Sequence, residues 1–160
     1  MKHYKAHWGI PLVVSSSLLT VLLLGVAFVA FWHGGHSLWL GLGLLALVAG
    51  CALCAIRGYT VTPDAILVHR LIWTTRLPLA GLQSAQFQPN VMRWSVRTFG
   101  NGGFFSFTGF YWNKPLGAYR AFVTDTRQTV VLRYDRRTVV LSPASPEEFA
   151  HEFGLSRVAS

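Results

Sequence analysis

The stretch IPLVVSSSLLTVLLLGVAFVAF, from Ile10 to Phe31, contains 22 residues without a charged side chain. A helix of about 20 apolar residues is long enough to cross the roughly 30 Å hydrocarbon core of a bilayer. Its Ser and Thr residues do not oppose this, because a helical hydroxyl group can hydrogen-bond to a carbonyl one turn earlier. The stretch therefore predicts a transmembrane helix.

A second uncharged stretch follows after a short connection. Trp32-His-Gly-Gly-His-Ser37 is polar and flexible, and Leu38 to Ile56 supplies 19 more residues without a charge. Two antiparallel transmembrane helices are therefore expected in residues 1–57. A cleavable signal peptide is the alternative for the first stretch, but its apolar core is too long and the small-residue cleavage pattern is missing.

The basic residues predict the orientation of this helical hairpin. They stand outside the two apolar stretches, at Lys2, Lys5, Arg57, Arg70 and Arg76, whereas the connecting turn contains no Lys or Arg. Under the positive-inside rule, both termini are then expected in the cytoplasm. Neither stretch contains an ionisable Asp, Glu, Lys, Arg or His, so the sequence does not indicate an ion or proton pathway.

Residues 58–160 differ in composition from the preceding part. They contain eleven of the 14 Lys and Arg residues and all six acidic residues of a chain whose net charge is +8. An anionic neighbour is therefore expected, either lipid headgroups or an acidic protein. The 160-residue chain has room for one domain beside the hairpin. Because Gly58 follows Arg57 directly, this domain is expected to lie close to the bilayer.

Alternating apolar and polar residues predict seven short strands in this domain. Their ranges are 59–62, 65–70, 72–77, 83–88, 119–124, 129–134 and 137–142. A terminal helix is predicted from Pro146 to about Phe153, with Ser145 as its N-cap and Glu148 closing a capping box. We expect Phe149 and Phe153 to cover the open end of a barrel or sheet.

Seven short strands followed by one helix form the layout of the pleckstrin-homology (PH) superfold. The segment FGNGGFFSFTGFYWNKPLGAYRAFVTD, Phe99 to Asp125, with the following VVLRYDRRTVVLSP, resembles the bacterial PH-like domain family in which two N-terminal membrane helices precede the domain. Its most distinctive parts are Gly-Asn-Gly-Gly at 100–103, Asn113 to Gly117 and Tyr119 to Ala121.

This resemblance implies a mainly β, PH-like domain in residues 58–160, with about seven strands in a barrel or sandwich and a C-terminal helix. It also implies a multi-pass protein of the bacterial inner membrane. It supplies no catalytic residue and no ligand, and the fold alone does not imply phosphoinositide binding.

The segment from Phe99 to Phe122 contains nine aromatic residues, and basic residues lie around or among them. The rings can complete a β core, because the glycines permit tight turns. Alternatively, some rings dip into the inner leaflet while the cations meet anionic headgroups, each adding about 1 kcal/mol. A third interpretation is a surface that receives another protein. The candidate lipid- or partner-binding residues are Arg93, Arg97, Phe104, Phe105, Phe110, Tyr111, Trp112, Lys114 and Arg120.

No sequence motif indicates catalysis, a metal or a cofactor. The patterns GxSxG, HExxH, GxGxxG and GxxxxGK[ST] are absent, and residues 100–103 are interpreted as a flexible turn rather than an anion-binding nest. Cys51 and Cys54 lie in an apolar stretch, where a thiol acts as a small hydrophobe. His33 and His36 lack a third ligand nearby. We expect neither an enzyme nor a nucleic-acid-binding protein.

The sequence thus favours a noncatalytic protein of the bilayer whose cytoplasmic domain is a protein-interaction or self-assembly module, with a protein partner or a second copy as its ligand. The alternative is anionic-lipid sensing, or binding to the membrane surface, through the basic aromatic segment.

Overall fold

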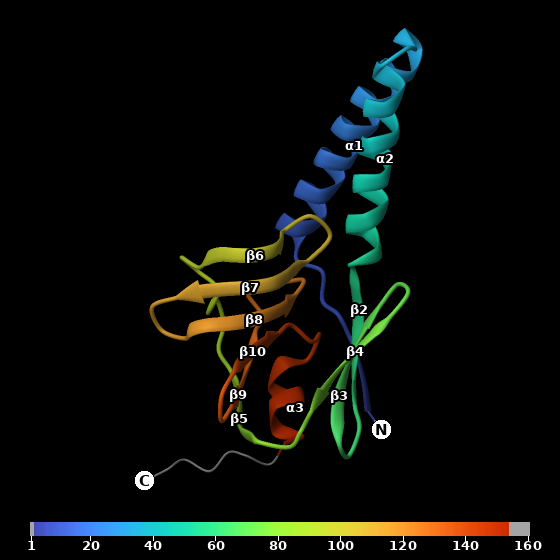
Figure 1. The fold of residues 1–160 in the computed structure, drawn as a ribbon. Helices are drawn as coiled ribbons and strands as arrows, with labels where there is room; N and C mark the ends of the chain where they lie inside the picture. Colours follow the sequence, from blue (N-terminus) through green and yellow to red (C-terminus); the bar gives the residue numbers. More distant parts are fainter. Residues whose placement is uncertain (1, 154–160) are drawn as a thin grey trace.

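A computed structural model describes residues 2–153. A long helical hairpin projects from a mainly β domain (Figure 1). The hairpin consists of α1 (Ile10–His33) and α2 (Ser37–Leu53). The turn between them contains Gly34 and Gly35, whose φ angles are 64° and 61°. Glycine adopts positive φ without the steric penalty that a side chain brings, so this sequence suits the sharp reversal.

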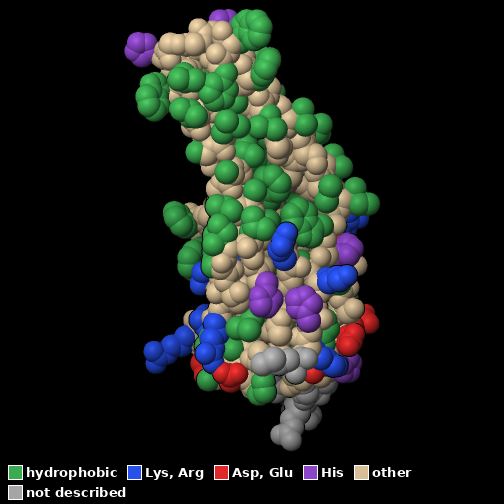
Figure 2. All heavy atoms as spheres, turned by 90° about the vertical axis from the view of Figure 1, so that its right-hand side faces the viewer, with side chains coloured by type: hydrophobic (Ala, Val, Ile, Leu, Met, Phe, Trp, Pro, Cys, Tyr) green, Lys and Arg blue, Asp and Glu red, His purple; other side chains and the backbone are tan. Residues whose placement is uncertain are grey.

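Most apolar side chains of the hairpin are exposed. In Figure 2 they cover the helices, whereas Lys, Arg, Asp and Glu side chains gather on the lower part of the molecule. The first helix is long and apolar enough to cross a membrane, and the second is apolar but shorter. At 1.5 Å per residue, the two are about 36 and 25 Å long. The second helix ends before the predicted limit because Ile56 begins a strand instead.

The β domain contains two sheets. The first has the order β1-β2-β3-β4, with all neighbours antiparallel. The second has the order β5-β9-β10-β8-β7-β6, in which β10 and β8 are parallel and the other neighbours antiparallel. The strands are β1 (Lys2–Lys5), β2 (Ile56–Val61), β3 (Ala65–Arg70), β4 (Thr74–Pro78), β5 (Leu82–Phe87), β6 (Val96–Gly102), β7 (Phe107–Asn113), β8 (Gly117–Val123), β9 (Val130–Tyr134) and β10 (Thr138–Leu141).

This architecture confirms a mainly β domain, excludes the predicted barrel alternative and corrects the predicted number of strands. The seven predicted strands correspond to β2–β5 and β8–β10, but β1, β6 and β7 were not predicted. Across residues 2–153 the strands form two sheets and no closed barrel. The prediction of a turn at residues 100–103 is also wrong, because Gly100, Asn101 and Gly102 form the end of β6.

The main core lies between the two sheets. Tyr59 and Ile66 of the first sheet and Phe122 and Leu132 of the second are fully buried there. The terminal helix, α3 (Pro146–His151), contributes Phe149, whose ring centroid lies 5.1 Å from Tyr4 and 6.3 Å from Tyr59. Phe149 therefore packs against the sheets as expected.

The predicted start and end of this helix need correction. It ends at His151, before the predicted limit. Ser145 has φ −120° and ψ 80° and makes no side-chain capping hydrogen bond, so the predicted capping box is not formed. Phe149 packs α3 onto the domain, and an ion pair of 3.6 Å between Glu148 and Lys2 of β1 adds to this contact.

Residues on both sides of the hairpin join the same sheet. Strand β1 pairs with β2, so that Tyr4 lies opposite Tyr59. Trp8 Nε1 donates a hydrogen bond to the carbonyl of Ile56 at 3.2 Å. The residues that the sequence suggested to be only a basic flank are thus a strand, and the chain enters and leaves the hairpin at the same side of the β domain.

Candidate functional site

The side of the β domain next to the helices carries apolar residues from three segments, which together we call the hairpin-proximal surface. The segments are the β3–β4 turn (71–73), the β6–β7 loop (103–106) and the outward-facing residues of β6 and β7. Of the second sheet, β6 is the strand nearest the helices, and it runs across their axis (Figure 1).

The β3–β4 turn presents three consecutive apolar residues to solvent. Leu71, Ile72 and Trp73 are 46%, 68% and 41% exposed. A hydrogen bond of 3.0 Å from Arg70 N to Trp73 O closes the turn, and Arg70 lies opposite Ile56, close to the end of α2. Turns usually carry polar residues, so an apolar turn at this place points to a contact. The predicted strand 72–77 includes Ile72 and Trp73, and none of the three residues was predicted to belong to a site.

The β6–β7 loop contacts the bases of both helices. Phe105 N donates a hydrogen bond of 2.9 Å to Ser16 Oγ of α1, and Ser106 Oγ donates one of 3.4 Å to the carbonyl of Cys54. The rings of Phe104 and Phe105 are half-buried, with centroids 4.7 Å apart. Ser16 is six residues beyond the start of α1, which corresponds to about 9 Å along the helix. The two rings therefore lie beside the apolar surface of α1.

One face of β6 and β7 is exposed and apolar. Val96, Phe99, Phe110 and Trp112 are 61%, 75%, 52% and 49% exposed. Phe99 lies opposite Phe110, and Val96 lies opposite Trp112, so all four share one face of the sheet. Arg120 continues this row on β8, with Cζ 5.7 Å from the ring of Phe110. We call Val96, Phe99, Phe110 and Trp112 the exposed aromatic face.

Tyr111 does not belong to this face, which corrects its place among the candidates. It is 4% exposed, and its ring lies 5.9 Å from that of Tyr119 in a second core. Its hydroxyl donates a hydrogen bond of 2.6 Å to the carbonyl of Asn101. Burial raises the pKa of Tyr111 to about 12. Tyr111 is a core residue and is not available to a lipid or a partner.

The remaining basic candidates stand outside the exposed aromatic face. Arg93 lies in the turn before β6, with Cζ 5.6 Å from the ring of Trp94. Arg97 lies opposite Tyr111 and so belongs to the other face of β6. Lys114 is exposed between β7 and β8. Of the four predicted cations, only Arg120 is brought to the rings of the exposed aromatic face.

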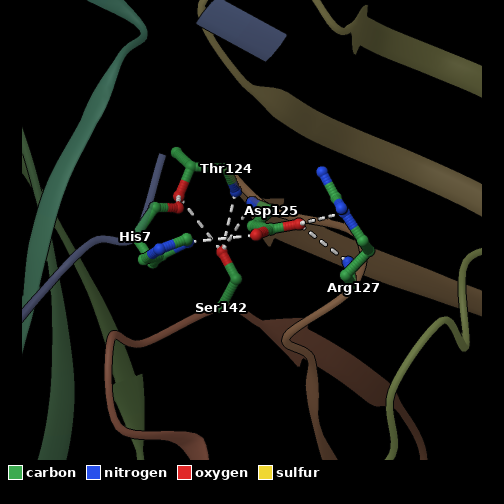
Figure 3. A network of polar contacts seen from close by, with 5 residues as sticks. All are labelled: His7, Thr124, Asp125, Arg127 and Ser142. Atoms are coloured by element: carbon green, nitrogen blue, oxygen red, sulfur yellow. Dashed lines mark hydrogen bonds and ion pairs between the residues drawn. The ribbon is translucent and has the colours of Figure 1, made fainter. Parts of the chain in front are cut away.

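A polar network fastens the arm before α1 to the end of β8 (Figure 3). The carboxylate of Asp125, a residue 5% exposed, lies 3.0 Å from His7 Nδ1 and accepts a hydrogen bond of 2.9 Å from Arg127 N. Thr124 Oγ1 donates a hydrogen bond of 2.6 Å to the carbonyl of His7. Ser142 Oγ accepts the N–H groups of Thr124 and Asp125 at 2.7 and 3.3 Å.

This network is structural in its geometry, although it contains Ser, His and Asp. Ser142 is fully buried, and its oxygen is engaged by two backbone donors rather than activated by a base. A nucleophile would need access to a substrate and a hydrogen bond to its base. The network therefore positions the arm, beside a pocket of about 230 Å³ whose lining includes Gly9, Leu12 and Asp125.

Comparison with known families identifies the part of the chain that follows the helical hairpin. Residues 57–154, more than half of the 160, match the family described as bacterial PH domain. Comparisons with curated proteins and with solved structures gave no match. The matched range includes the β3–β4 turn, the β6–β7 loop and the exposed aromatic face, and it leaves the helical hairpin outside.

Proposed function

The chain belongs to the bacterial PH domain family, and from this premise we propose that it is a noncatalytic, membrane-anchored module that binds the surface of an anionic membrane. Domains of this family are binding modules for proteins or lipids. The observation that carries the proposal is the position of the three apolar segments. All of them lie on the side of the domain from which the exposed apolar hairpin projects.

The proposed anchor is the α1–α2 hairpin, crossing the bacterial inner membrane twice. The length and exposed apolar surface of α1 support this, as do the basic flanks and the uncharged Gly34-Gly35 turn. Pairing of β1 with β2 keeps both ends of the hairpin on one side, which agrees with cytoplasmic termini. Residues 58–160 then form most of the cytoplasmic domain, which β1, Ile56 and Arg57 complete.

This arrangement brings aromatic rings to the depth where they are most stable. With Ile10 at the bilayer surface, Phe104 and Phe105 lie beside the first turns of α1, and Trp73 lies in the apolar turn next to Ile56. Amphipathic Trp rings settle at the boundary between headgroups and acyl chains, and Phe rings on an apolar face insert just below it. Asp64, by contrast, lies in the β2–β3 turn at the opposite end of these strands.

The test uses the full chain in lipid nanodiscs. Amide hydrogen exchange at residues 71–73 and 96–106 is expected to be slower with phosphatidylglycerol than with phosphatidylcholine, because anionic headgroups attract the basic domain. Ile72→Ser should reduce the difference, whereas Ala80→Ser, at an exposed position between β4 and β5, should not. Equal exchange in both lipids at low salt would reject the proposal.

Self-assembly is a second candidate, supported by the position of β6. This strand is at the edge of the second sheet, and Val96 and Phe99 on it are exposed. An exposed apolar edge strand can pair with a strand of another chain. If β6 joins two copies, light scattering of the full chain in detergent should give a dimer, and Phe99→Lys should give a monomer. A monomer at all concentrations would exclude this candidate.

A further inference from the structure

Two arginines from different sheets approach the ring of Phe122. The Cζ atom of Arg70, on β3, lies 5.2 Å from the centroid of this ring, and that of Arg120, on β8, lies 4.8 Å from it. Arg70 is the last residue before the apolar β3–β4 turn. Both guanidinium groups thus lie against the ring of one core residue, beside the hairpin-proximal surface. Arg70 is half-buried, whereas Arg120 is exposed.

Neither guanidinium has a carboxylate partner within residues 2–153. The Nε and Nη2 atoms of Arg70 are buried and make no hydrogen bond among the described residues. Burial lowers the pKa of the Arg70 guanidinium, and the charge of Arg120 lowers it further. Buried polar groups are almost always paired, so the two unpaired donor atoms of Arg70 are an exception that needs a reason.

Aromatic rings hold the arginines but do not neutralise them. The ring of Trp73 lies 5.2 Å from Arg70 Cζ, and that of Phe110 lies 5.7 Å from Arg120 Cζ. Stacking on a ring face leaves the N–H donors in the guanidinium plane to bind another group. The planar donors of arginine match the oxygens of a phosphate group, often two at a time.

We propose that Arg70 and Arg120 together bind one phosphate group between the two sheets. Trp73, in the exposed turn, covers this position and moves aside when the phosphate enters. The inference rests on the proposed function and gives it a ligand, because the headgroup of an anionic phospholipid is the phosphate nearest to an anchored domain. A soluble phosphate ion offers the same oxygen atoms to the arginines, and the experiment distinguishes it from the lipid.

The experiment titrates the full chain in uncharged detergent micelles and follows the probes by ³¹P NMR. The probes are dihexanoyl phosphatidylglycerol, dihexanoyl phosphatidylcholine and inorganic phosphate. We expect phosphatidylglycerol to bind most tightly and its dissociation constant to rise about tenfold in Arg120→Gln and in Arg70→Gln. Arg136→Gln removes the same charge from the exposed β9–β10 turn and should bind as the wild type does.

The two sources of phosphate give different results. Binding of inorganic phosphate alone, lost in the same two variants, would support the site and assign it to a soluble ligand. Equal affinity of the wild type, Arg70→Gln and Arg120→Gln for every probe would overturn the proposal. If Arg70→Gln does not fold, Arg70→Lys keeps the charge but loses the planar donors and should still bind more weakly than the wild type.

This outcome is independent of the test of membrane-surface binding. Micelles offer no bilayer surface, so the phosphate site can be present even if nanodiscs fail to protect β6. Conversely, Arg120→Gln can leave both the protection of β6 on nanodiscs and the binding of phosphate unchanged. That result would support membrane-surface binding and contradict the arginine site.

Discussion

The two faces of β7 contain similar residues in opposite environments. Tyr111 is 4% exposed, whereas its neighbours Phe110 and Trp112 are 52% and 49% exposed. Successive side chains of a strand point to opposite faces, so a single step along the chain separates core from surface. On one face, Tyr111 packs with Tyr119 and Met92, and on the other the rings meet solvent and Arg120. The number of aromatic residues in a segment therefore does not reveal which of them are buried.

The largest expected effect comes from truncating the buried face. Tyr111→Ala should lower the free energy of unfolding by about 3–5 kcal/mol, because it leaves a cavity in a close-packed core. Chemical denaturation of the full chain in detergent, followed by circular dichroism, measures this. Phe110→Ala is the matched control and should change the value by less than about 1 kcal/mol. Equal losses of unfolding free energy in the two variants would contradict the difference in burial between the two faces of β7.

A second prediction concerns the close approach of β6 to β7. The alternation of buried and exposed residues along β7 depends on it. Gly109 has φ 143°, and a Cβ atom there would lie 2.2 Å from the carbonyl oxygen of Phe99. Gly109→Ala should therefore destabilise the domain by about 2–4 kcal/mol, through backbone strain and displacement of β6.

Gly117→Ala separates these two causes. Gly117 also has positive φ, 69°, but a Cβ atom there meets nothing within 4 Å. Its expected loss is about 1–2 kcal/mol, from conformation alone. The same denaturation experiment compares the two variants, and a larger loss for Gly117→Ala would contradict the close approach of β6 and β7.

Alkaline pH should lower the stability of the protein through buried tyrosines and not through the exposed aromatic face. Burial raises the pKa of Tyr59 to about 12, above its ordinary value of 10.0. Protonated Tyr59 therefore makes its full contribution to the free energy of unfolding below pH 10. This contribution is lost as the pH rises to 12, by up to about 1.4 kcal/mol per pH unit, because Tyr59 releases its proton at lower pH in the unfolded state than in the folded state. Absorbance of phenolate at alkaline pH, measured beside unfolding, follows this change. A slope that is the same in Tyr59→Phe would disprove the assignment.

The smallest effect on stability is expected on the exposed aromatic face. Trp112→Ser should change the free energy of unfolding by less than about 0.5 kcal/mol, because the side chain is 49% exposed and lies outside both cores. The same variant should reduce the protection of residues 96–102 against hydrogen exchange on phosphatidylglycerol nanodiscs. Unchanged protection would restrict membrane contact to the two loops.

The parts of the fold that depend on local pattern were predictable. The uncharged stretch at Ile10–Phe31 predicted α1, and period-two alternation predicted β2–β5 and β8–β10. Strand β6 was missed because Gly100 and Gly102 suggest a turn, and only the partner strand explains them: at Gly100 a Cβ atom would lie 2.3 Å from Thr108 O. Strand β1 was missed because its partner, β2, lies beyond the whole hairpin.

The site was predictable only in part, for related reasons. Phe110 and Trp112 were placed among candidate surface residues and are exposed. Tyr111 was grouped with them because a run of three aromatic residues conceals the alternation. The arginine pair was missed because Arg70 and Arg120 are brought together by two different sheets. A usable signal was present in Arg70-Leu-Ile-Trp73, where apolar residues follow an arginine between two strands.

Pairing of β1 with β2 also sets an order for synthesis. The ribosome makes β1 before the hairpin and β2 after it, so the first sheet must wait until both helices have emerged. In the proposed membrane arrangement, a hairpin that crosses only once would leave the two strands in different compartments. Strand β2 would then keep an unpaired edge, which can pair with a strand of another chain. In that arrangement, β1 can pair with β2 only when both helices cross the membrane.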